Sequence, residues 1–153
     1  MKKATFQGGV HPDDQKQFSR NIPFFVYESK GEMVFPLSQH IGAPASPVVK
    51  KGDEVLAGQM IAQAAGFVSA NIISSCSGTV KSIEKRMIVT GAKIPSIVIE
   101  NDGEYRTVEG TGTEVDYKTL TKEDILEKIK DAGIVGLGGA GFPTPVSYTH
   151  LRA

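Results

Sequence analysis

Short apolar runs separated by Gly, Pro and Ser fill residues 33–100, and this punctuation constrains the fold more than any other feature. Runs of this length are typical of β-strands, because a globular helix needs about 8–20 residues without such breaks. The sequence therefore predicts a β domain. The expected strands are residues 33–37, 48–50, 60–65, 71–73, 79–83 and 97–100.

Two features of this region favour a sandwich of two similar halves. Residues 40–50 and 71–81 share Ile, Ser, Val and Lys in register, which is typical of a repeat. The pattern G-D-x-V-x-x-G-Q-x-I at residues 52–61, followed by SGTV, resembles the biotinyl/lipoyl carrier fold. Carriers hold their cofactor on a lysine at a hairpin tip, and no lysine lies between Lys51 and Lys81. We expect the scaffold without the carrier function.

Charge and composition exclude several partners. The 17 basic and 17 acidic residues balance, so no basic field attracts nucleic acid. A single cysteine, Cys76, excludes an intramolecular disulfide and any all-cysteine metal or iron–sulfur site within this sequence, and favours a reducing compartment. No apolar run approaches about 18 residues. We therefore expect neither direct membrane insertion nor a signal peptide.

The clearest helix spans residues 120–133. Thr121 is a good N-cap, and the acidic residues Glu123 and Asp124 suit the first turn. Gly133 supplies a left-handed stop. This helix leads into five glycines within residues 133–141.

The glycine run has two interpretations that the residues alone leave open. Glycines free several backbone N–H groups to bind one anion, as in a phosphate cradle, and a helix starting at Pro143 would add its positive end. The alternative is a flexible turn. The pattern G-x-G-x-x-G at residues 136–141 is weak evidence for a dinucleotide fold, because a helix precedes it instead of a strand.

Seven motifs together resemble the N-terminal part of the RnfC family, whose members are subunits of the ion-translocating ferredoxin:NAD oxidoreductase (Rnf) complex. They are GGVHP at residues 8–12, PLSQHIGAP at 36–44, GD-x-V at 52–55, GFVSA at 66–70, SGTV at 77–80, IENDG at 99–103 and GLGGAGFPT at 136–144. The last is also similar to the flavin- and NADH-binding loop of respiratory complex I.

The resemblance implies a mainly β fold with some α: a barrel-sandwich hybrid domain, then one helix and the start of a Rossmann-like flavin/NADH domain. It implies electron transfer between NADH and ferredoxin, beside other subunits of a complex on the cytoplasmic side of the inner membrane. Its cofactors are FMN, NADH and 4Fe-4S clusters in a later part. The implied cofactor-binding residues here are Gly136, Gly138, Gly139, Ala140, Gly141 and Phe142.

We expect five segments: an extended arm (1–32), the β domain (33–103), a linker (104–119) with a short strand near 105–108, the beginning of the FMN/NADH domain (120–144) and a tail (145–153). The tail departs from the family pattern, and the cluster cysteines are missing. We therefore expect a truncated, soluble chain that binds no cofactor and has no catalytic activity of its own.

Other functions have less support. The β domain could serve only as a docking module for partner subunits. Hydrolase chemistry at Ser38 and His40, or at Ser75 and Cys76, lacks an appropriately spaced base and acid. A metal site would require His11, His40 and His150 to converge from three distant loops.

Overall fold

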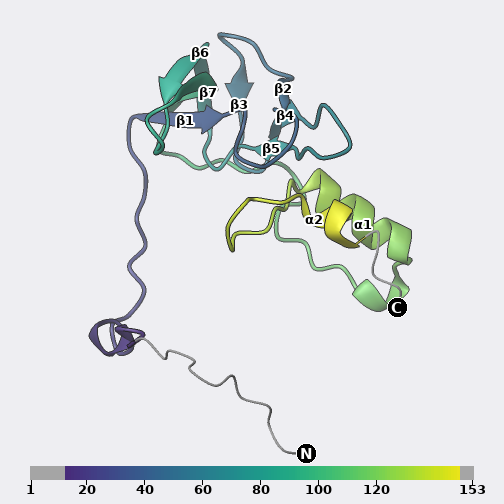
Figure 1. The fold of residues 1–153 in the computed structure, drawn as a ribbon. Helices are drawn as coiled ribbons and strands as arrows, with labels where there is room; N and C mark the ends of the chain where they lie inside the picture. The colour runs from purple at the N-terminus through teal and green to yellow at the C-terminus, as the bar shows by residue number, and fades with distance from the viewer. Residues whose placement is uncertain (1–12, 149–153) are drawn as a thin grey trace, which may run out of the picture.

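The structure is a computed structural model that describes residues 13–148 (Figure 1). The GGVHP motif, His11 and His150 lie outside the described residues. Within them, seven strands form two antiparallel sheets. The larger sheet has the order β1 (Glu32–Pro36), β7 (Lys93–Asn101), β6 (Gly78–Met87) and β3 (Glu54–Val55); the smaller has β2 (Ser46–Pro47), β4 (Met60–Gln63) and β5 (Ile72–Ile73).

The two sheets share one apolar core. Ile97 and Ile99 of β7 and Val80 of β6 are almost completely buried and belong to the same cluster as Val55 and Ile61. Val55 comes from β3 in the larger sheet, whereas Ile61 comes from β4 in the smaller one. Side chains from both sheets therefore fill a common interior, as in a sandwich.

The strand predictions were right in kind but uneven in their limits. Strands β6 and β7 extend well beyond the predicted segments, because they form a long hairpin whose outer end carries exposed polar residues that give no apolar signal. Strand β2 lies at residues 46–47, just before the predicted 48–50. Strand β3 was missed, since two residues are too short to show alternation.

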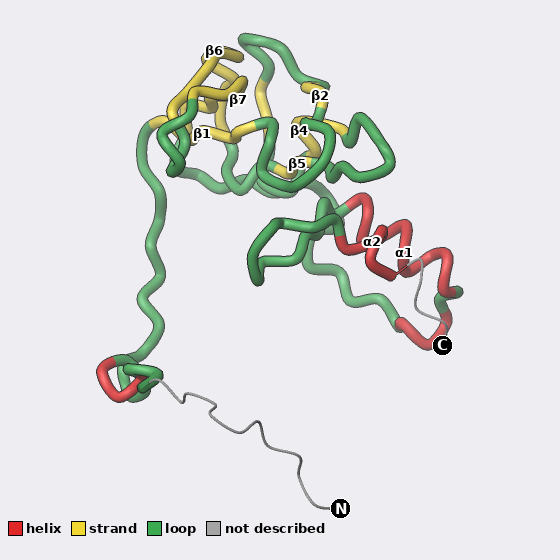
Figure 2. The backbone as a smooth tube through the Cα atoms, viewed as in Figure 1, coloured by secondary structure: helices red, strands yellow, loops and turns green. Residues whose placement is uncertain are grey.

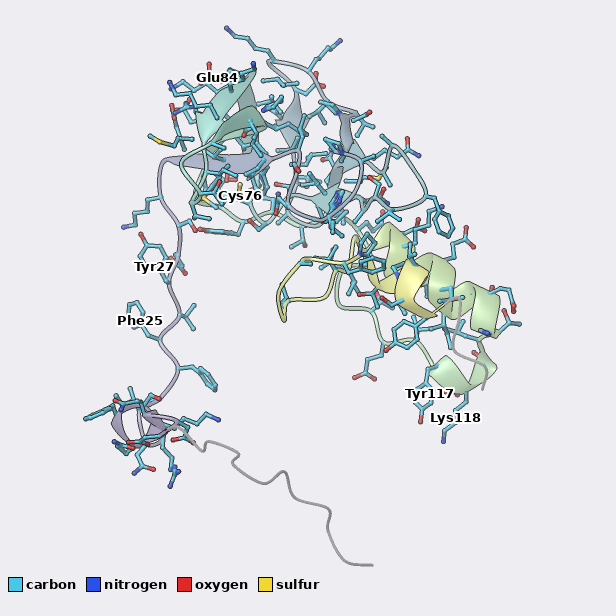
Figure 3. The ribbon with its side chains drawn as sticks, viewed as in Figure 1. Phe25, Tyr27, Cys76, Glu84, Tyr117 and Lys118 are labelled. Atoms are coloured by element: carbon cyan, nitrogen blue, oxygen red, sulfur yellow. The ribbon has the colours of Figure 1, made fainter. Side chains whose placement is uncertain are left out.

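Cys76 lies in the shared core, where Figure 3 shows it beneath the larger sheet. Its side chain is fully buried, and burial raises the pKa of the thiol. The protonated thiol is a poor nucleophile, so Cys76 acts as a small apolar residue.

An extended arm precedes β1 and leaves the β domain as a single strand of chain (Figure 1). It begins with a 3-10 turn, η1 (Lys16–Phe18), and is fastened at Ser29, whose carbonyl accepts hydrogen bonds from Asn101 Nδ2 (2.8 Å) and Tyr105 Oη (2.7 Å). Between these points the apolar side chains are exposed, and Figure 3 shows Phe25 and Tyr27 projecting from the arm.

The segment after β7 lies against the β domain before it reaches the helices. Ala57 N–H donates to the Arg106 carbonyl (2.8 Å), and Val108 N–H donates to the Ala57 carbonyl (3.0 Å). An isolated parallel bridge between Ala57 and Thr107 stands where a short strand was expected. The chain then passes through η2 (Tyr117–Thr119) to α1 (Lys122–Asp131) and α2 (Thr144–Tyr148), which contact each other (Figure 2).

Asp102 organises the turn that begins this segment. Its carboxylate accepts hydrogen bonds from Ser77 Oγ (2.6 Å), Glu104 N–H (2.9 Å) and the Arg106 guanidinium (3.0 Å). These bonds, above all the one from Ser77, lower the pKa of Asp102 to about 2.

We expect Asp102 to contribute to acid sensitivity. Its pKa in the folded chain is below that of an unfolded aspartate, about 3.9, so the ionised form stabilises the fold above about pH 4 and this contribution disappears as the pH falls toward 2. Thermal unfolding of Asp102→Asn, followed by circular dichroism, should depend less on pH across this window than unfolding of the original chain. Glu109→Gln, at an exposed carboxylate, is the control. Equal acid dependence in Asp102→Asn and the original chain would contradict the assignment.

Candidate functional site: the glycine-rich loop

Helix α1 delivers the chain to the loop as the sequence predicts. Thr121 Oγ1 accepts from Asp124 N–H (3.1 Å), and the Asp124 carboxylate accepts from Thr121 N–H (2.8 Å), which forms a reciprocal capping box. These bonds from Thr121 lower the pKa of Asp124. Gly133, with φ of +64°, lies just beyond the last turn and provides the predicted left-handed stop.

The loop is closed at its base by main-chain hydrogen bonds. Val135 and Pro143 form an antiparallel bridge. Gly136 N–H donates to the Phe142 carbonyl (2.8 Å), and Thr144 N–H donates to the Ile134 carbonyl (3.0 Å). Residues 137–142 are thus a loop on a defined stem.

The tip of this loop has unused hydrogen-bond donors. Among residues 13–148, no acceptor is found for the backbone N–H groups of residues 137–142. The tip is open to solvent, with Leu137 96% exposed. Several backbone donors on one exposed loop are suited to binding an anion.

Gly138 and Gly139 are not required by the fold as the structure shows it. A Cβ added at either position would meet no atom within 4 Å, and neither residue has the left-handed φ that favours glycine. Missing side chains at these positions leave the backbone open to close approach by an external group. This differs from Gly133 and Gly141, whose φ angles are positive and which pack closely against the β domain.

The predicted site residues Gly136, Gly138, Gly139, Ala140, Gly141 and Phe142 all lie on this loop or its stem. Gly136 differs from the others because its N–H is already bonded to the Phe142 carbonyl.

The expected helix start at Pro143 was off by one residue, because α2 begins at Thr144 and Pro143 contributes its carbonyl as acceptor for Val146 N–H (3.2 Å) and Ser147 N–H (3.4 Å). With only five residues, α2 is too short to support the predicted helix-dipole contribution.

The sequence did not reveal that two residues of the β domain hold this loop. Asn71 Nδ2 donates to the Lys130 carbonyl in the last turn of α1 (3.2 Å), and Ile41 N–H donates to the Gly141 carbonyl (3.4 Å). His40, next to Ile41, is buried beside Gly141. The PLSQHIGAP and GFVSA motifs, which flank these residues, were the available signal, but they carry no information about which element they contact.

His40 uses both ring nitrogens in structural hydrogen bonds. Nε2 accepts from Ala70 N–H (3.2 Å), so Nδ1 carries the proton and donates to the Ile41 carbonyl (3.1 Å). No nitrogen is left for a metal ion in this arrangement. Across residues 13–148, no cluster of three or more potential metal-ligating side chains is found.

A cavity of about 200 Å³ lies between the tip of the β4–β5 hairpin and the end of the loop. Its walls are mostly apolar, with Phe67 and Pro143 on opposite elements and Lys130 nearby. A cavity of about 150 Å³ is enough for one benzene ring. A hollow therefore exists beside the loop, next to the stem.

The fold and the loop together define a class of protein: a barrel-sandwich domain followed by a capped helix and a glycine-rich loop with free amides. The model of the RnfC barrel sandwich hybrid domain family matches residues 4–104, more than half of the 153-residue chain. The chain belongs to this family, and the predicted barrel-sandwich fold is confirmed. None of the helices in residues 13–148 is long and apolar enough to cross a membrane.

Curated relatives extend the match beyond the β domain. One subunit of the proton-translocating ferredoxin:NAD(+) oxidoreductase complex of Clostridium ljungdahlii is 48% identical over 142 residues, which cover 93% of this chain and 31% of that protein. The corresponding subunit of the Na(+)-translocating complex of Acetobacterium woodii is 41% identical over 149 residues, 95% of this chain and 33% of that protein.

The equivalent subunit of the ion-translocating oxidoreductase complex of Klebsiella pneumoniae is 38% identical over 145 residues, which cover 94% of this chain and 19% of that protein. The chain thus spans about a third or less of the length of these relatives.

Gly133→Ala should loosen helix α1 from the β domain. A Cβ at this position would collide with the Asn71 carbonyl, and alanine in the left-handed region costs about 1–3 kcal/mol. We expect a lower thermal unfolding midpoint by circular dichroism. The matched control is Gly138→Ala, where the added methyl meets open space. A Gly133→Ala chain as stable as Gly138→Ala would show that the contact with Asn71 does not hold the helix.

Proposed function

We propose that this chain supplies the phosphate-binding loop of a redox subunit that exchanges electrons between NADH and ferredoxin in an ion-translocating complex. The relatives are named as subunits of such complexes. The single observation that carries the proposal is the open space at Gly138 and Gly139, where the fold would accept side chains but the sequence has none.

The residues of the loop fit a phosphate group. The unpaired N–H groups of residues 137–142 would donate to the phosphate of FMN or of the nicotinamide dinucleotide, which the resemblance implies as cofactors. FMN would supply the electron-accepting ring, and the loop's contribution would be to hold its phosphate. The cavity beside Pro143 offers an adjacent apolar surface.

Iron–sulfur clusters do not fit this sequence. A 4Fe-4S cluster is held by four cysteine thiolates, and the only cysteine here is buried in the β core. Electron transfer would therefore need cluster ligands from outside these 153 residues. We infer that the chain alone is catalytically inactive and that it works beside partner subunits, at the cytoplasmic face of the membrane that holds the complex.

The phosphate proposal predicts weak but local binding of FMN. In the ¹⁵N-labelled chain, FMN should shift the amide signals of residues 137–142, while riboflavin, which lacks the phosphate, should shift them far less. Purified protein should be colourless and should not oxidise NADH, because a loop without the rest of a nucleotide domain holds its ligand only loosely.

A charge change on the loop provides the matched control for that titration. Gly139→Asp should abolish the FMN-dependent shifts, because a carboxylate beside the free amides would compete for them and repel phosphate. Ala92→Asp, in the exposed turn between β6 and β7, introduces the same charge elsewhere and should leave the shifts intact. Equal shifts with riboflavin, or none with FMN, would refute a phosphate site.

A docking function for the β domain is the second candidate, and the exposed arm favours it. Phe24 is fully exposed and Phe25 is 85% exposed, and Val26 and Tyr27 follow with little cover. Consecutive exposed apolar side chains of this size mark interaction surfaces.

The arm should be dispensable for folding of the isolated chain. Phe24→Ser combined with Phe25→Ser should leave the unfolding midpoint nearly unchanged, because substitutions at exposed sites change stability by about 0.5 kcal/mol or less. Binding of a hydrophobic dye such as ANS should decrease. Phe35→Ser, in the buried core, should instead lower the midpoint strongly. A large loss of stability in the arm variant would show that the arm already packs on this chain.

A further inference from the structure

We infer that the barrel-sandwich domain positions the glycine-rich loop through a clamp made of two β-domain loops, residues 39–43 and 68–71, in which His40 and Asn71 are the positioning residues. The inference rests on the proposed phosphate-binding role of the loop. It gives the β domain a task in that role, beyond a scaffold or a docking surface.

The two halves of the clamp are bonded to each other. Ala43 N–H donates to the Val68 carbonyl (2.9 Å), and Ser69 Oγ donates to the Ala43 carbonyl (2.8 Å). Ala70 N–H donates to His40 Nε2 (3.2 Å), so the His40 ring bridges the two loops. These bonds make residues 39–43 and 68–71 one rigid unit.

One half of the clamp holds the chain just before the glycine-rich loop. Asn71 Oδ1 accepts from Ala64 N–H (2.9 Å), which fixes the side chain, and its Nδ2 donates to the Lys130 carbonyl (3.2 Å). The Asn71 carbonyl also packs against Gly133 so closely that a Cβ there would collide with it. The end of helix α1 is therefore set by Asn71.

The other half holds the far end of the loop. Ile41 N–H donates to the Gly141 carbonyl (3.4 Å). A Cβ at Gly141 would lie 3.0 Å from the Gln39 carbonyl oxygen and 3.2 Å from His40 Cα, so only glycine allows this approach without displacement. The two ends of the loop are thus held by the two halves of one unit, while the tip at residues 137–140 is free of contacts.

Such an arrangement prepares the free amides for a ligand. Fixing both ends of a loop lowers the conformational entropy lost when it binds, which increases affinity without any new contact with the ligand. His40 and Asn71 would act on the phosphate only through the loop.

The test compares neutral variants of the clamp in the whole 153-residue chain. Asn71→Ala removes the tether to helix α1, and His40→Leu removes the bridge between the two clamp loops. His40→Gln offers a carbonyl that can accept from Ala70 N–H and should rescue. Asn101→Ala is the matched control, because its side-chain amide also binds a backbone carbonyl, that of Ser29, away from the clamp.

We expect Asn71→Ala and His40→Leu to raise the dissociation constant for FMN, measured by amide shifts, about threefold to tenfold, as for the loss of one hydrogen bond. The ¹H–¹⁵N heteronuclear NOE of residues 137–140 should fall in the ligand-free chain. His40→Gln and Asn101→Ala should behave like the original chain. Should His40→Leu fail to fold, Asn71→Ala and Gly141→Ala test the two halves of the clamp separately.

The outcomes separate the clamp from the phosphate site. If the original chain does not respond to FMN but Asn71→Ala lowers the NOE of residues 137–140, the phosphate proposal is wrong and the clamp stands. If Asn71→Ala changes neither the NOE nor the affinity by more than Asn101→Ala does, the clamp is overturned.

Discussion

The hydrogen bond from the Asn71 side chain to the last turn of α1, together with the close packing of Gly133 on the Asn71 carbonyl, joins the two units of this chain. Without it, a β-sandwich and a pair of helices would be connected only by residues 102–121, the stem contact at Gly141 and apolar packing. With it, the glycine-rich loop starts from a fixed point on the β domain. The availability of the loop's amides to a ligand depends on this joint.

The joint also changes the meaning of the carrier-like fold. In biotinyl and lipoyl carriers the hairpin tip carries a modified lysine, whereas the corresponding tip here, residues 64–69, contains no lysine. The tip instead leads directly to Asn71 and lines the cavity beside the glycine-rich loop. The same scaffold therefore holds a loop at the place where a carrier would hold a cofactor, by hydrogen bonds instead of a covalent bond.

Local signals in the sequence predicted those elements whose cause is local. The cap at Thr121, the stop at Gly133 and the β character of residues 33–100 each follow from residues close together in the chain. The length of the β6–β7 hairpin, the two-residue strand β3 and the tether from Asn71 to Lys130 depend on partners far away in sequence. No periodicity or propensity near Asn71 specifies that its amide meets a helix 59 residues later.

Amide hydrogen exchange across residues 133–144, read residue by residue, tests most directly whether the loop is held at its ends and open in the middle. The N–H groups of Gly136 and Thr144, which close the stem, should exchange slowly. Those of residues 137–142 should exchange at rates close to those of an unstructured peptide. Uniformly slow exchange would show that the tip amides already have partners, and uniformly fast exchange would show that no stem holds the loop. Either result would contradict a preformed anion site.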